Sequence, residues 1–175
     1  MDIEKALQEL TNTIKTISSS PKLDSEILIM EALKISRAYL HAHKNKQLSS
    51  QEEKILIKLG KRRKQKEPMA YITGKKEFWS REFLVTTDTL IPRPESELLV
   101  EEALKFTQGN PSTRILELGT GCGAIAISLA LERPKTSIMA TDISQKTLDQ
   151  AIKNAHQHNV ENIQFIKSNW FKRIK

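Results

Sequence analysis

The sequence has a single cysteine, few aromatic residues and no long apolar run. One cysteine, Cys122, excludes an internal disulfide framework and is typical of a protein kept in a reducing compartment. No apolar run approaches the roughly 18 residues that a membrane-spanning helix needs. The charged N-terminus also lacks the apolar core of a signal peptide. We therefore expect a cytoplasmic protein with no membrane contact.

Charge of both signs is plentiful, with an excess of bases. Charged residues make up 28% of the chain, hydrophobic residues 38%, and the formal net charge is +7. This balance is typical of a globular protein of one domain or two small ones. Six bases follow one another without an acid between them: Lys58, Lys61, Arg62, Arg63, Lys64 and Lys66. Such a cluster at a helix end complements the helix dipole. Contact with ribosomal or other RNA is the alternative.

The first part of the chain has the pattern of amphipathic helices. Apolar residues recur every three or four positions up to about residue 67. Ser20 before Pro21 predicts a helix start, and Ser50 with Glu53 has the spacing of a capping box. The second helix is predicted to turn four residues inward: Leu23, Ile27, Met30 and Leu33. Nothing in this part resembles a catalytic site, so we predict a helical recognition bundle over residues 1–74.

A different pattern begins after Gly74. Residues 75–91 are predicted to form a β-hairpin linker, because aromatic and β-branched residues precede a turn-like stretch. Residues 92–94 form a rigid proline corner, and a helix is expected over residues 95–107. Strands are then predicted at residues 114–118, 137–141 and 162–166, with helices between them. This alternation predicts an α/β domain over residues 92–175, with a parallel sheet and right-handed crossovers.

One glycine-rich loop carries the chemistry. Glu117-Leu-Gly119-Thr120-Gly121-Cys122-Gly123 follows a predicted strand and opens a helix whose free amides favour negative charge. Asp142 ends the next strand, where a carboxylate can accept hydrogen bonds from both hydroxyls of a ribose. The two features together predict an adenosine-containing ligand. The spacing Gly119-x-Gly121-x-x-Ala124 also fits a dinucleotide fingerprint, so a protein that binds NAD(P) or a flavin remains an alternative.

Five segments of the chain form a recognisable combination. They are Glu67-Pro-Met-Ala-Tyr-Ile-Thr-Gly74, Glu77-Phe-Trp-Ser80, Leu90-Ile-Pro-Arg-Pro-Glu-Ser-Glu97, Ile115-Leu-Glu-Leu-Gly-Thr-Gly-Cys-Gly-Ala-Ile-Ala126 and Ser168-Asn-Trp-Phe171. Together they resemble the release factor glutamine N5-methyltransferases, over essentially the whole chain. The resemblance implies a Rossmann-like class I methyltransferase domain, S-adenosylmethionine as cofactor and class 1 peptide-chain release factors as partners. A release-factor docking module without catalysis is a second alternative.

The resemblance also implies residue roles. Residues 119–123, which include Thr120 and Cys122, would hold the methionine part of the cofactor. Asp142 would hold the ribose, and Trp170 would lie near the adenine. Asn169 stands where the family often has aspartate. Four further residues are expected at the border of the site: Arg93, Pro94, Glu97 and Glu117. No metal site is expected, since His41/His43 and His156/His158 are pairs whose members point to different helix faces.

The family's catalytic loop, Asn-Pro-Pro-Tyr, has no counterpart in these 175 residues. That loop holds the glutamine amide in position, and positioning carries much of the catalysis. No catalytic residue is therefore assigned, and we expect the chain alone to be inactive. Residues 114–118 are expected to be left at a sheet edge. From this pattern we expect a fragment, a truncated version or the product of a disrupted gene.

Overall fold

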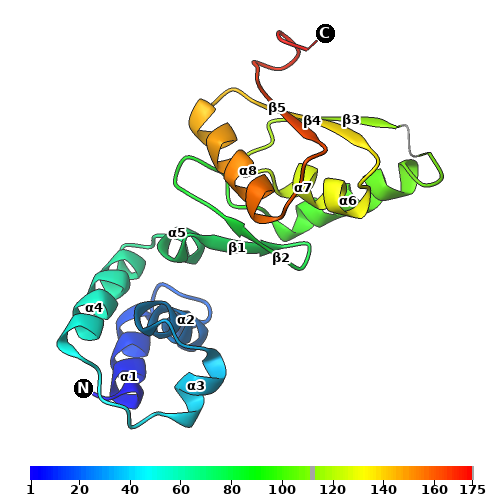
Figure 1. Cartoon of the computed structure of the whole chain (residues 1–175). Helices are drawn as coiled ribbons and strands as arrows, with labels where there is room; N and C mark the ends of the chain where they lie inside the picture. The colour runs from blue at the N-terminus through cyan, green and yellow to red at the C-terminus, as the bar shows by residue number, and fades with distance from the viewer. Residues whose placement is uncertain (111–112, 175) are drawn as a thin grey trace. The chain divides into compact units, whose positions relative to one another are not determined.

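The computed structural model describes residues 1–110 and 113–174 (Figure 1). The chain divides into two compact units, Met1–Thr73 and Gly74–Lys175. The first unit is helical, and the second contains every strand of the described residues. The boundary therefore falls where the sequence changes from a helical to a mixed pattern.

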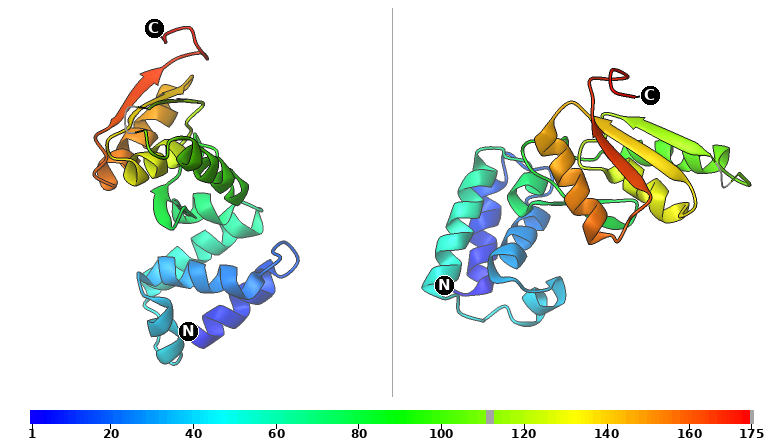
Figure 2. Two further views of the ribbon diagram at one scale, coloured as in Figure 1. Left: turned by 90° about the vertical axis from the view of Figure 1, so that its right-hand side faces the viewer. Right: turned by 45° about the horizontal axis from the view of Figure 1, so that its top comes forward.

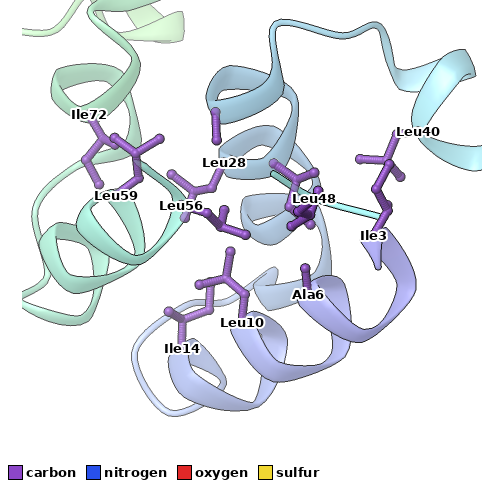
Figure 3. Packing of buried hydrophobic residues seen from close by; sticks show 12 residues of the cluster. Ile3, Ala6, Leu10, Ile14, Leu28, Leu40, Leu48, Leu56, Leu59 and Ile72 are labelled. Carbon is purple, nitrogen blue, oxygen red and sulfur yellow. The ribbon is translucent and has the colours of Figure 1, made fainter. Parts of the chain in front are cut away.

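Five helices make up the first unit. They are α1 (Ile3–Ile14), α2 (Pro21–Leu33), α3 (Arg37–Ala42), α4 (Ser50–Lys64) and α5 (Met69–Thr73). Their shared core is aliphatic, and Figure 3 shows side chains of α1 and α4 meeting in it, among them Leu10 and Leu56. Gly60 permits the close approach of α4, because a Cβ there would lie 2.8 Å from Leu10 Cδ1. The apolar periodicity thus predicted the correct class of structure, although α5 was not predicted.

Two details of this unit differ from the prediction. Leu23 was predicted to point inward but is 43% exposed, whereas Leu28 and Ile29 are buried. The capping box uses Ser49 and Glu52 in place of Ser50 and Glu53. Both spacings exist in the sequence, and the structure has the earlier one, while Glu53 pairs with the N-terminal amine.

The second unit begins with a hairpin that packs on a later helix. Strands β1 (Lys75–Phe78) and β2 (Arg81–Leu84) pair antiparallel. The turn residues Trp79 and Ser80 have left-handed φ values of 52° and 54°. Glu97 accepts the backbone N–H of Trp79, which supports this turn. The segment predicted as a linker is therefore built into the second unit.

A parallel three-stranded sheet forms the centre of this unit. Its strands are β3 (Arg114–Leu118), β4 (Ser137–Asp142) and β5 (Ile163–Lys167), in the order β3-β4-β5. The connecting helices α7 (Ala124–Glu132) and α8 (Gln145–Gln157) pack against one face of it (Figure 2). A short 3-10 helix η1 (Pro94–Ser96) leads into α6 (Glu97–Phe106), which packs on α7. The predicted Rossmann-like arrangement is confirmed, and within the described residues β3 is an edge strand.

Candidate functional site

The glycine loop lies between the end of β3 and the start of α7. Gly119, Gly121 and Gly123 all have left-handed φ values, 77°, 58° and 85°, which other residues rarely adopt. A Cβ at Gly119 or Gly121 would meet no atom within 4 Å, so the space beside these two residues is open. At Gly123 a Cβ would lie 2.9 Å from Ile127 Cδ1. The first two glycines therefore leave room for a ligand, while the third permits close helix packing.

Backbone hydrogen bonds fix the loop against β4. The N–H groups of Gly119 and Thr120 both donate to the Thr141 carbonyl oxygen, each at 2.8 Å. The N–H of Gly121 donates to Oδ2 of Asp142 at 3.1 Å. The two predicted halves of the site, the loop and the acid, are therefore in direct contact.

Asp142 is held at the carboxyl end of β4 by backbone donors. Its Oδ1 accepts the N–H of Ser144 at 3.0 Å, while Oδ2 accepts from Gly121. An ionised carboxylate has about four lone-pair sites, so two accepted bonds leave capacity for further donors such as hydroxyl groups. The arrangement orients the side chain without saturating it.

Glu117 lies in β3, two residues before the loop, and contacts the loop through Thr120. Burial raises the pKa of its carboxyl group to about 7, and the negative charge of Asp142 adds to this effect. The Thr120 hydroxyl donates to Oε2 of Glu117 at 2.7 Å and acts in the opposite direction. Glu117 thus changes its charge near neutral pH beside the open space of the loop.

Asn154, on α8, connects the loop to the hairpin and was not predicted. Its side chain is fully buried. The Nδ2 group donates to the carbonyl oxygens of Cys122 at 2.8 Å and Leu84 at 2.9 Å, and Oδ1 accepts the Leu84 N–H. The Cys122 thiol is buried too, which raises its pKa to about 11 and leaves it protonated at neutral pH. A polar residue at a core-facing position of the helix was the signal available in the sequence.

A hollow of about 320 Å³ lies at the carboxyl ends of β4 and β5. Ile143, Ser168 and Asn169 contribute to its lining, together with three bases. Ile143 follows Asp142 directly and is 65% exposed. The apolar Ile143, directly after the acid that ends β4, could have been recognised in the sequence as a residue that lines this hollow, but it was not predicted.

The remaining predicted residues, within the part of the chain that the structure describes, form no hydrogen bond or ion pair with the loop. Trp170 is 69% exposed, and its carbonyl oxygen accepts the Ser168 hydroxyl. Arg93 and Pro94 are exposed, and Glu97 is bonded to the hairpin turn. Within residues 1–110 and 113–174, no hydrogen bond or ion pair joins these four residues to residues 119–123. Their roles at the site stay predictions.

Neither a metal cluster nor a membrane-spanning helix is found among residues 1–110 and 113–174. Among the described residues, no cluster of three or more His, Cys, Asp or Glu side chains has the arrangement of a metal site. Over the same residues, no helix combines the length and apolar character that crossing a membrane requires.

Comparisons with known proteins match both units. Residues 5–74 match the PrmC N-terminal domain family, and residues 110–175 match a methyltransferase domain family. The chain is 46% identical over 170 residues to the release factor glutamine methyltransferase of Coxiella burnetii, covering 97% of this chain and 61% of that protein. The corresponding proteins of Salmonella typhimurium and Escherichia coli are 41% and 39% identical over 174 residues, covering 99% of this chain and 62% of each.

The homologues of this chain are release factor glutamine methyltransferases. The chain spans about three fifths of the length of these relatives. Together with the methyltransferase domain match, they indicate S-adenosylmethionine as the cofactor. Among solved structures, the ribosomal protein L11 methylase from Lactobacillus delbrueckii subsp. bulgaricus is similar at a TM-score of 0.43, with 19% identity over 52% of this chain and 46% of that one.

Proposed function

We propose that this chain binds S-adenosylmethionine through residues 119–123 and Asp142, and supplies the donor-binding part of a protein-glutamine N5-methyltransferase. The acceptor class is the class 1 peptide-chain release factors, and the compartment is the cytoplasm. The observation that carries the proposal is the contact between the glycine loop and Asp142 at the carboxyl edge of adjacent parallel strands. Ligands of α/β sheets bind at this edge.

The chemistry of the residues present fits the cofactor. The open sides of Gly119 and Gly121 leave space for the methionine part, and α7 begins directly after the loop with amides that favour its carboxylate. Asp142 has acceptor capacity left for the ribose hydroxyls. In the hollow at the carboxyl ends of β4 and β5, the exposed side chain of Ile143, which follows that acid in sequence, offers an apolar contact for the adenine. When bound, the cofactor supplies an electrophilic methyl group.

In this proposal, the residues around the glycine loop act by positioning the cofactor. The fixed amides of Gly119 and Thr120 keep the loop open, while Asn154 anchors its Cys122 end to α8. Trp170 lies outside the loop contacts, and we propose that it approaches the adenine only when the cofactor binds. Arg93, Pro94 and Glu97 belong to the border of the site in this proposal.

Calorimetry with two ligands tests the cofactor class. S-adenosylhomocysteine, the demethylated form of the cofactor, is titrated into the 175-residue chain in parallel with NAD. We expect saturable heat with S-adenosylhomocysteine and none with NAD. Binding of NAD alone would replace the proposal with the dinucleotide alternative.

Methyl transfer by the chain alone is tested separately. The sequence contains no Asn-Pro-Pro segment, so nothing in it corresponds to the family's means of holding the acceptor amide. We expect no radiolabelled methyl incorporation into a class 1 release factor, even where the chain binds the cofactor. Incorporation above the background of a protein-free control would show that the amide is held by other residues of this chain.

A further inference from the structure

An open groove runs between α1 and α4 in the first unit, whereas the glycine loop belongs to the second unit. Its volume is about 230 Å³. The floor is apolar, formed by Leu10, Leu56 and the bare backbone of Gly60. Ile57 also lines the groove and is 51% exposed, the largest exposure of a large apolar residue in this unit. Together with the floor, this side chain makes a contiguous apolar surface in the groove.

One side of the groove carries a row of lysines. Lys61 and Lys64 line it, and Lys54 and Lys58 continue the same face of α4 at helical spacing. None of these four lysines has an ion-pair partner among the described residues. The acids of the first turn of α4 do not balance them, since Glu52 pairs with Lys46 and Glu53 with the N-terminal amine.

The two arginines of the same helix are already engaged within the unit. Arg62 forms two hydrogen bonds with Glu67, and its guanidinium lowers the pKa of that carboxyl group. Arg63 pairs with the buried Asp24 at 2.9 Å. The basic cluster therefore separates into internal arginines, which stabilise the fold, and outward lysines, which remain available.

The opposite side of the groove, on α1, has a different character. It carries Glu9 and Thr13, whose hydroxyl donates to the Glu9 carbonyl oxygen. The groove thus has an apolar floor, one basic side and one side with an acid. A bound helix would accordingly present apolar residues to the floor of the groove, acids to the lysines of α4 and polar or basic groups to α1.

We propose that this groove docks an acidic amphipathic helix of a protein partner. Helices bind grooves through apolar residues at i, i+3, i+4 and i+7, and flanking charges set their orientation. Nucleic acid fits the groove less well. The bidentate arginines that hold phosphates are occupied, no aromatic side chain lines the groove for base stacking, and the floor is apolar.

Fluorescence anisotropy of the 175-residue chain tests the proposal. The probe is a short labelled helical peptide with leucines at the four anchor positions and glutamates beside them. We expect saturable binding that weakens about tenfold in the double variant Lys58→Glu/Lys61→Glu. The matched control is Lys15→Glu/Lys22→Glu, which changes net charge equally at two exposed lysines that do not line the groove. It is expected to bind as the unchanged chain does.

A second pair of variants separates apolar contact from charge. Ile57→Ala should weaken binding several-fold, whereas Ile55→Ala, on the same helix but outside the groove, should not. Unchanged far-UV circular dichroism confirms that all four variants fold.

Four results would overturn the proposal. They are an absence of saturable binding, equal loss in both lysine pairs, equal binding of a probe whose glutamates are replaced by lysines, and tighter binding of a labelled single-stranded RNA of similar charge. Self-association of the chain that the peptide cannot compete with would assign the groove to a second copy instead. Because the readout is binding to the first unit, the result is independent of cofactor binding and methyl transfer.

Discussion

The two units differ in how completely each covers its own apolar side chains. In the first unit the aliphatic core is closed, and buried acids such as Asp24 and Glu26 are paired with arginines. In the second unit large apolar residues are exposed to solvent on α6, at the sheet edge and near the C-terminus, and Phe106 is 85% exposed. The first unit therefore has the features of a self-sufficient fold. The second holds its loop rigidly while leaving much apolar surface uncovered.

The largest expected effect tests whether the units are independent. Leu28 is fully buried in the first unit, so Leu28→Ala should destabilise that unit by about 2–5 kcal/mol. Both tryptophans, Trp79 and Trp170, lie in the second unit and report on it alone. Both units contribute to the far-UV circular dichroism signal. In urea unfolding, we expect a component of that signal to unfold at lower urea while the tryptophan fluorescence transition stays. Equal shifts in both signals would mean that the units unfold as one.

The next effect concerns the second unit. Asn154→Ala removes the three hydrogen bonds of a fully buried side chain and leaves backbone groups of Leu84 and Cys122 without this partner. We expect a loss of about 2–4 kcal/mol, seen in the tryptophan transition. Gln157→Ala is the control, because its amide makes one exposed bond to Glu82, and it should cost less than about 0.5 kcal/mol. Similar losses in the two variants would refute a special role for Asn154.

A pH-dependent effect follows from Glu117. Its pKa in the folded state, about 7, lies above the ordinary value of 4.5. The folded state therefore favours the protonated form, and this contribution to stability is complete below pH 4.5 and is lost as pH rises toward 7. Glu117→Gln cannot ionise and avoids that loss. The free energy of unfolding of this variant, relative to that of the unchanged chain, should therefore rise by at most about 3 kcal/mol between pH 4.5 and 7. Urea unfolding from pH 4 to pH 8 measures the difference, and a constant difference would contradict the burial of this carboxyl group.

The smallest effect returns to the first unit. Ser49→Ala removes the hydroxyl that caps α4 and should cost about 1 kcal/mol. Ser50→Ala, at the position that the sequence pattern favoured, should change stability little. The circular dichroism transition compares the two, and a larger loss at Ser50 would restore the original capping assignment.

Features set by local chemistry could be predicted from the sequence. The strand, loop and helix around residues 119–123 follow from glycine spacing and apolar runs, and Ser144 caps α8 through the Thr147 N–H. The pairing of β3 with β4, and the contact of the loop with Asp142, then follow from the topology of parallel sheets. The fold of this region was predicted correctly, whereas the binding roles of residues 119–123 and Asp142 stay predictions.

Features that depend on distant partners could not be predicted. Asn154 bonds to residues 32 and 70 positions away. Its core-facing position on α8 marks it as buried and polar, but local sequence does not name these distant partners. Leu23 is exposed, while the neighbouring acids Asp24 and Glu26 are buried. These acids pair with Arg63 and Arg37, which lie on other helices, so the inward face of α2 depends on distant partners. The roles of Trp170, Arg93, Pro94 and Glu97 rest on the resemblance and stay predictions.

Calorimetric titration of S-adenosylhomocysteine into variants of Asp142 tests the central claim most directly. Asp142→Ala should weaken binding at least about tenfold, because charged hydrogen bonds contribute about 1.5–3 kcal/mol, and Asp142→Asn should weaken it less. Asp149→Ala, an exposed acid on α8, is the control and should bind normally. An unchanged tryptophan transition confirms that each variant is folded. If folded Asp142→Ala bound S-adenosylhomocysteine as tightly as the unchanged chain, the assignment of this loop and acid to the cofactor would be wrong.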